Sequence, residues 1–134
     1  MTPATNANPI DRLLAGIEAG NIPDNVFSDD ATFDATVPNW RFSVHGGATV
    51  REQLSGWYAD PGRFQSLERT AIPEGELIEF TLTWTEHDVE HTCHQAHILK
   101  LVNNRVSNDT AFCGGRWPAT LVAEMQQAQQ QTAP

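Results

Sequence analysis

Apolar residues near the start of the chain recur at the spacing of a helix. Four of them fall on one helical face: Ile10, Leu13, Leu14 and Ile17. Asn8 can cap the free amides of such a helix, Pro9 is favoured at its first position, and Asp11 suits its positive end. Gly20 is a typical stop. The pattern therefore predicts an amphipathic helix between Asn8 and Gly20.

A second helical pattern follows in the middle of the chain. Its apolar residues are Val50, Leu54 and Trp57. Thr49 and Glu52 have the spacing of a capping box, in which each side chain satisfies an end amide of the helix. We expect this helix over about 49–59, and between the two helices a short helical turn within 23–28 and a small strand over 32–37.

The second half of the chain alternates between apolar and polar residues with a period of two, after a turn at Asp60-Pro61-Gly62. Runs rich in β-branched and aromatic residues predict strands over 64–72, 77–85, 89–102 and 105–112. Consecutive strands with short turns indicate an antiparallel meander. Pro118 then opens a terminal helix, whose apolar residues Leu121, Val122 and Met125 are expected to cap the open end of the sheet.

The composition fits one domain. The chain has 134 residues, of which 40% are apolar and 19% are charged, enough to bury one sizeable core. We expect a disordered or frayed N-terminus over 1–8, a single domain over 9–125, and a frayed Gln-rich tail over 126–134.

Charge and cysteine content narrow the class of partner and compartment. Seventeen acidic residues against eight basic ones give a net charge of -9, which disfavours nucleic acid and anionic membranes. No apolar stretch is as long as a bilayer span, and residues 1–8 lack the apolar core of a signal peptide. We expect a cytoplasmic protein whose two cysteines, Cys93 and Cys113, are thiols.

The order of these elements resembles the nuclear transport factor two-like, or SnoaL-like, superfamily. The match rests on the stretch Phe27-Ser28-Asp29-Asp30-Ala31-Thr32, a Gly46-Gly47 turn, and the long meander that follows the helix. Stretches similar to Pro38-Asn39-Trp40-Arg41 and Cys113-Gly114-Gly115-Arg116-Trp117 occur in uncharacterised bacterial members. The resemblance implies a cone-shaped α+β fold, the cystatin-like α+β barrel, in which a curved, mixed but mostly antiparallel sheet wraps around N-terminal helices.

In this fold the inner sheet face lines a cavity, and the outer face commonly forms a homodimer. On the strand over 77–85, small hydroxylated residues alternate with bulky apolar ones, which by the resemblance face inward. Such a wall suits a small hydrophobic ligand, or else it simply fills the core. The expected ligand-binding residues are Phe33, Trp57, Tyr58, Phe80, Leu82, Trp84, Gln95 and Cys113.

The resemblance also directs the side chain of His97 inward, on the next strand. A two-residue turn at Asn103-Asn104 would set His97 opposite Thr110, whereas a three-residue turn would set it opposite Asp109 and Cys93 opposite Cys113. The family pattern favours the second register. A carboxylate next to an imidazole fixes the tautomer of the ring and suits it to general acid or base catalysis. His97 and Asp109 are therefore the candidate catalytic residues, and a hydrogen-bonded core histidine is the alternative.

Other chemistry is disfavoured. His91 and His97 share a strand face but are too far apart to bind one metal ion, and His94 points the other way, so we expect no metal and no cofactor. The base of ketosteroid isomerases corresponds to Ala35 and their tyrosine to Leu13 or nearby. The triad of limonene epoxide hydrolase corresponds to Trp84, Leu82 and Ala111. Neither reaction can be transferred to this chain.

Three functional hypotheses follow. The first is a cofactor-independent acid–base enzyme, of isomerase, lyase, cyclase or hydrolase type, that acts on a small hydrophobic or polycyclic metabolite through His97 and Asp109. The second is a non-catalytic ligand-binding or regulatory protein with the same pocket. The third is a structural or interaction protein. An enzyme predicts an open cavity bounded by Phe80, Leu82, Trp84 and His97, from which the imidazole can be reached. A binding protein predicts the same cavity, and solid packing around His97 would exclude both.

Overall fold

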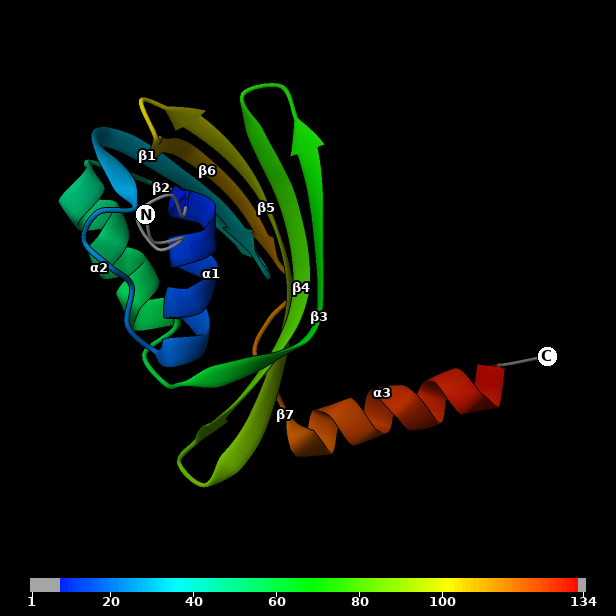
Figure 1. Cartoon of the computed structure of the whole chain (residues 1–134). Coiled ribbons are helices and arrows are strands. Elements are labelled where there is room, and N and C mark those ends of the chain that lie inside the picture. The colour runs from blue at the N-terminus through cyan, green and yellow to red at the C-terminus, as the bar shows by residue number, and fades with distance from the viewer. Residues whose placement is uncertain (1–7, 133–134) are drawn as a thin grey trace, which may run out of the picture.

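The computed structural model describes residues 8–132 and has three helices and a curved sheet. The elements in chain order are α1 (Pro9–Ala19), β1 (Phe27–Val37), β2 (Trp40–His45), α2 (Gly47–Trp57), β3 (Gly62–Ile72), β4 (Gly75–Glu86), β5 (Val89–Val102), β6 (Arg105–Cys113), β7 (Trp117–Pro118) and α3 (Ala119–Thr132). The sheet bends around α1 and α2, which lie against its concave face (Figure 1). This confirms the α+β class.

The sheet is mixed and open. Its strand order is β2-β1-β6-β5-β4-β3, with the short β7 paired to β5. All neighbours are antiparallel except β1 and β6, which are parallel. β2 and β3 are the two edges, so the sheet curves without closing into a barrel. The predicted meander is confirmed for β3 to β6.

The first helix forms as its sequence predicts. The side chain of Asn8 accepts a hydrogen bond from the amide of Asp11 at 2.9 Å, and the Asp11 carboxylate accepts one from the amide of Asn8. Pro9 occupies the first helical position, and Gly20 ends the helix in a left-handed conformation with φ 74°. The apolar face is fully turned to the sheet. Of the expected frayed segment over 1–8, residues 1–7 lie outside the described residues.

The segment between the first two helices differs from the prediction. No helical turn forms within 23–28; the chain instead enters β1 at Phe27. Val26 and Phe27 are both buried, and the carbonyl of Val26 accepts from the amide of Val106 at 2.9 Å, so sheet pairing with β6 replaces the turn. The sequence analysis also missed β2, whose Phe42 and Val44 face the core in an alternating pattern.

The capping box predicted for the second helix does not form. α2 begins two residues earlier, and Gly46 is its N-cap without a side-chain hydrogen bond. The Gly46 amide donates to the carbonyl of Ala31 at 2.8 Å. A Cβ atom on Gly47 would lie 2.3 Å from the carbonyl oxygen of Ser28, so only glycine permits this close approach to β1. The approach to β1, rather than the Thr49 hydroxyl, therefore determines where the helix starts.

The terminal helix does not cap the open end of the sheet. β7 pairs with the start of β5, at His91 and Thr92, and from there α3 projects away from the body (Figure 1). Leu121 and Met125 are consequently exposed. The helix also continues past Met125, because the Gln-rich segment remains helical as far as Thr132.

Both registers considered for the β5–β6 hairpin are wrong. The turn has two residues, but the ladder then shifts by one more residue between the turn and the site. Ser107 is the additional residue, and the resulting β-bulge places His97 opposite Ala111 rather than opposite Thr110 or Asp109. This shift decides which side chains meet inside the fold.

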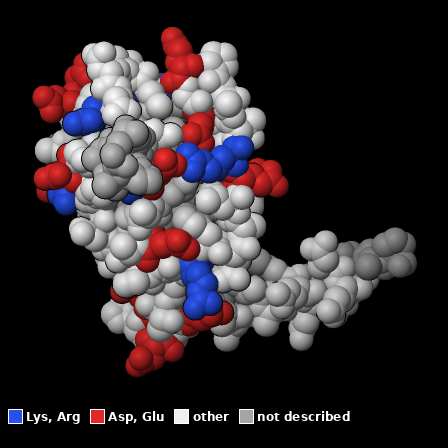
Figure 2. All heavy atoms as spheres, in the orientation of Figure 1, with Lys and Arg blue, Asp and Glu red and all other residues white. Residues whose placement is uncertain are grey.

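Acidic side chains are scattered over the surface among uncharged residues (Figure 2). On the face shown in Figure 2, Lys and Arg occur as isolated residues, several of them next to an acid. Arg69, for example, contacts both Asp11 and Glu76, at 2.7 and 2.8 Å. Within residues 8–132, no helix has the length and apolarity needed to cross a membrane.

Candidate functional site

His97 and Asp109 form a buried pair beneath the two helices. The side chain of His97 is 1% exposed and that of Asp109 is not exposed at all. Nδ1 of the imidazole lies 2.8 and 3.0 Å from the two carboxylate oxygens, to which it donates because a carboxylate only accepts. The ring stacks on Phe80 at 5.7 Å between ring centres. This arrangement fixes both the tautomer and the orientation of the ring.

The second nitrogen of the imidazole is also engaged inside the protein. Nε2 of His97 lies 2.9 Å from Oε1 of Gln95 and 3.2 Å from the hydroxyl of Tyr58. The amide oxygen only accepts, so Nε2 donates to it when the nitrogen carries a proton. Tyr58 donates a short hydrogen bond to the same Gln95 oxygen. Asp109, His97, Tyr58 and Gln95 therefore form one connected polar network, supplied by the C-cap of α2 and by β5 and β6. Burial of such a group without partners would be costly, and here each member has one.

Tyr58 remains a neutral donor in this network. Burial raises its pKa well above the ordinary value of a phenol, and the negative charges of Cys93, Asp109 and Cys113, in their ionised forms, raise it further. The neutral hydroxyl can donate to Gln95, whereas a phenolate could not. The network is thus built around an uncharged tyrosine.

Solid packing surrounds the network on the side of β3 and β4. Phe80 and Leu82 are buried in the core, and Phe80 meets Phe64 edge to face at 5.0 Å. Trp84 is 7% exposed and stacks on His91. Phe33 is fully buried among other aromatic rings. The expected wall is therefore core, because Phe80, Leu82, Trp84 and Phe33 all belong to the buried hydrophobic cluster.

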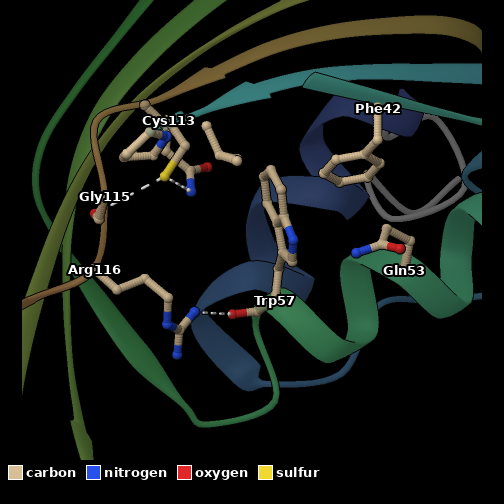
Figure 3. Close-up of a pocket in the computed structure, with 9 residues that line it drawn as sticks. Phe42, Gln53, Trp57, Cys113, Gly115 and Arg116 are labelled. Carbon is tan, nitrogen blue, oxygen red and sulfur yellow. Dashed lines mark hydrogen bonds between the residues drawn. The ribbon is translucent and has the colours of Figure 1, made fainter. Parts of the chain in front are cut away.

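A cavity of about 340 Å³ lies next to the network, between the C-terminal half of α2 and the β6–β7 loop (Figure 3). This volume is within the usual range of small-molecule pockets, near its lower end. Its lining residues are Val37, Pro38, Phe42, Gln53, Trp57, Gln95, Cys113, Gly115 and Arg116. Most of the lining surface is apolar, with the amide of Gln95 and the thiol of Cys113 on the sheet side.

Two aromatic rings form the helix side of the cavity. The Trp57 ring extends from α2 and stands between Cys113 and Phe42, as Figure 3 shows. Trp57 and Phe42 meet edge to face at 6.3 Å, and both contact Phe33 in the same way, at 5.3 and 6.0 Å. Edge-to-face contacts of this kind hold rings in defined orientations. The cavity therefore has a rigid aromatic wall.

Gln95 connects the buried network to the cavity. Its Oε1 faces Tyr58 and His97, and its Nε2 donates to the sulfur of Cys113 at 3.3 Å. Gln95 itself is 4% exposed, and it lies directly opposite Cys113 in the β5–β6 ladder. The His97–Asp109 pair does not line the cavity and acts on it only through Gln95 and Tyr58.

Arg116 lies at the cavity from the loop between β6 and β7. Its Nη1 donates to the carbonyl of Trp57 at 3.0 Å and its Nη2 to the carboxylate of Glu86 at 2.6 Å. The guanidinium carbon is 4.7 Å from the ring centre of Trp84. Hydrogen bonds from Trp84 and Arg116 lower the pKa of Glu86, so this acid stays ionised and holds the guanidinium in place.

The two cysteines are free thiols in different surroundings. Cys93 is buried, and it does not lie opposite Cys113 as one register had it, because Gln95 is the β5 residue opposite Cys113. Burial, with a smaller contribution from Cys113, raises the pKa of Cys93 to about 12. Cys113 is partly exposed at the cavity.

The structure thus places three of the expected ligand-binding residues at the cavity: Trp57, Gln95 and Cys113. Tyr58 lies behind them in the network, and the other four, Phe33, Phe80, Leu82 and Trp84, lie in the core. Sequence reasoning missed Phe42, Gln53 and Arg116. The alternation of Phe42 with Val44 was the available signal for β2. Arg116 stood in a stretch that the resemblance used, but nothing in the sequence directs it to the cavity.

The positions of the histidines and of the other potential metal ligands bear on the expected absence of a metal site. No group of three or more His, Cys, Asp or Glu side chains within residues 8–132 is placed to hold a metal ion. His94 lies on the outer face of β5, where it contacts Thr81 and Glu79 at 2.9 and 3.0 Å.

Several solved structures of bacterial proteins have the same architecture. An NTF2-like protein from Anabaena variabilis matches with a TM-score of 0.69 at 12% identity, covering 80% of this chain and 84% of that one. An NTF2-like protein of unknown function from Mesorhizobium loti has a TM-score of 0.65 at 13% identity, with coverages of 80% and 88%. A proposed isomerase from Bacillus subtilis has a TM-score of 0.61 at 9% identity, with coverages of 81% and 90%.

The chain therefore has the nuclear transport factor two-like (NTF2-like) fold, as its sequence predicted. No protein-family model matches the sequence, and no curated protein does. At identities of 9–13%, these solved structures show the fold alone.

Proposed function

We propose that this protein binds a small, largely apolar molecule in the cavity between α2 and the β6–β7 loop. The supporting observation is the cavity itself, about 340 Å³ of space with Trp57 and Phe42 on one side and the polar groups of Gln95 and Cys113 on the other. An apolar pocket with a few convergent polar groups is the usual form of a small-molecule site.

The geometry favours binding over catalysis as the primary function. The groups best suited to move a proton, His97 and Asp109, are buried and bonded to one another, and Gln95 stands between them and the cavity. An amide side chain orients a ligand well but does not act as an acid or base near neutrality. In this proposal the pair fixes Gln95, and Gln95 anchors the polar end of the ligand.

A neutral fluorescent probe tests the proposal. N-phenylnaphthylamine, whose emission rises in apolar surroundings, should bind saturably to the wild-type chain. Cys113→Phe adds a ring inside the cavity and should weaken this binding at least tenfold. Thr85→Phe adds the same ring at an exposed position on β4 and is the matched control, with circular dichroism to verify that both variants fold. Equal binding by the two variants would refute the cavity as the site.

Acid–base catalysis is the second candidate, and the continuous network from Asp109 to Gln95 is the observation that favours it. Rotation of the Gln95 side chain away from His97 would uncover Nε2 of the imidazole on the side of the cavity. An imidazole backed by a carboxylate would then be within reach of a ligand. The reaction would be of isomerase, lyase, cyclase or hydrolase type on a small hydrophobic metabolite, without a cofactor.

A solvent-exchange experiment distinguishes the binding proposal from the catalytic one. Enolisable ketones that bind the cavity would be incubated in deuterium oxide and examined for incorporation of deuterium next to the carbonyl. An enzyme should catalyse incorporation, and His97→Gln should abolish it while leaving the affinity for N-phenylnaphthylamine within about twofold. If the wild-type chain binds these ketones without exchange, the acid–base proposal fails for this class and the binding proposal stands.

We further propose a homodimer through the outer sheet face, in a cytoplasmic protein. Two cross-strand pairs of β5 and β6 support the dimer, namely Ala96 with Phe112 and Ile98 with Thr110, because they lie on the face away from the helices and Phe112 is 47% exposed. Two free thiols are typical of a reducing compartment.

A further inference from the structure

The cavity differs in charge from the rest of the molecule. The whole chain has 17 acidic and 8 basic residues, but among the described residues that line the cavity the one charged side chain is Arg116. A positive group at an apolar cavity attracts a ligand with a negative or strongly accepting end.

The guanidinium of Arg116 is held in place by a carboxylate, a backbone carbonyl and an aromatic ring. Glu86 accepts from Nη2, the carbonyl of Trp57 accepts from Nη1, and the ring of Trp84 lies under the guanidinium carbon. Neither Glu86 nor Trp84 lines the cavity, so no carboxylate of the described residues occupies the space next to Arg116 where a ligand would bind. An arginine fixed in this way loses little side-chain entropy when a ligand binds.

Arg116 also retains donors for a ligand. An arginine carries about five N–H donors, and its contacts with residues of the described part of the chain use one on each terminal nitrogen. Its side chain is 44% exposed. The free N–H groups can therefore bind a carboxylate whose apolar part rests against Trp57 and Phe42.

We infer that the natural ligand is a small aromatic or alicyclic carboxylate, oriented with its acid group on Arg116 and its ring on the Trp57–Phe42 wall. This inference rests on the proposed binding function and adds the chemical class of the ligand. The Gln95 amide, which also lines the cavity, then faces the end of the ring away from the acid group.

Cinnamate and cinnamamide test the inference, because they share one planar shape and differ in charge. Calorimetric titration of the wild-type chain should give about tenfold tighter binding of cinnamate, the value of one exposed charge-assisted hydrogen bond. Added salt should reduce this preference. In Arg116→Gln the two affinities should agree within about twofold, while that for cinnamamide stays at the wild-type value, which shows that the cavity is intact.

A second variant covers the possibility that Arg116→Gln disturbs the loop. Glu86→Gln removes the negative charge but keeps a side-chain oxygen that can accept from Nη2 of Arg116, so the guanidinium stays in place and the preference for cinnamate should be kept or strengthened. Loss of the preference in Glu86→Gln, equal binding of both compounds to the wild-type chain, or binding of neither would each overturn the inference. Binding of N-phenylnaphthylamine decides separately whether the cavity is a ligand site, so failure of the carboxylate class is distinguishable from failure of the pocket.

Discussion

His97 and Asp109 are hydrogen-bonded at 2.8 Å although they are not opposite one another in the sheet. Ala111 lies opposite His97, and Leu99 lies opposite Asp109, so the contact runs diagonally between β5 and β6. Diagonal neighbours on one sheet face are within reach of long side chains. The small side chain of Ala111 leaves the imidazole room to lean toward the carboxylate. The pair thus depends on the bulge at Ser107, which sets this register.

The pair should contribute strongly to stability. Asp109→Asn keeps the shape of the side chain but removes the charge beside a fully buried imidazole, and loss of one member of such a pair typically costs about 3 kcal/mol of unfolding free energy. Urea denaturation monitored by circular dichroism measures this loss. Asp34→Asn is the control, because Asp34 pairs with Arg41 at the surface and its replacement should have little effect. Equal losses in the two variants would contradict the prediction.

Tyr58 should be silent in an alkaline titration until the protein unfolds. It is the one tyrosine of the chain, so the ultraviolet absorbance of tyrosinate reports on it alone. Burial raises its pKa in the folded state, and the folded chain therefore keeps a proton that the unfolded chain releases above about pH 10. The unfolding free energy should consequently be unaffected below this pH and fall above it. Tyrosinate that appears near pH 10 while the far-ultraviolet circular dichroism is still native would refute this prediction.

The fold was predictable because most of its elements have local signals. Alternation along β3 to β6 and the caps of α1 are properties of the sequence itself, and both appear where expected. The start of α2 was not predictable in the same way. It depends on the close approach of Gly47 to Ser28, a tertiary contact that competes with the local capping box of Thr49 and prevails over it.

The site was less predictable than the fold. Inward-facing residues of β4 and β5 could be identified from alternation, but alternation does not distinguish a residue that fills the core, such as Phe80, from one that lines a cavity, such as Gln95. The hairpin register was missed because the extra residue, Ser107, is not a glycine and nothing in its sequence context marks a bulge. Arg116 reaches the cavity from a loop whose path no periodic pattern specifies.

One substitution tests whether the outer sheet face forms the proposed dimer. Sedimentation velocity at micromolar concentration should show a dimer for the wild-type chain, and Phe112→Glu should convert it to a monomer, because two carboxylates would be buried against an apolar face. Trp40→Glu is the control, since Trp40 is also exposed, 69%, but lies on the edge strand β2. A wild-type monomer, or equal dissociation by both variants, would contradict the prediction.

The two thiols should differ in reactivity, and the difference should report on the cavity. The pKa of Cys93, raised to about 12 by burial, leaves almost no thiolate at about pH 8, and thiolate is the reactive form. Iodoacetamide should therefore label Cys113 in the native chain and both residues after unfolding, as measured by peptide mass spectrometry. Cys113→Ser should remove native labelling altogether.

Because Cys113 lines the cavity, a saturating ligand should slow its alkylation by covering the sulfur. N-phenylnaphthylamine is the probe for this protection experiment, and the rate at Cys93 after unfolding serves as the internal reference. Protection by at least about tenfold is expected, since a site occupied about 90% of the time is accessible for the remaining tenth. If Cys113 is labelled at the same rate with and without bound probe, the probe binds outside the cavity, and the cavity is not the ligand site.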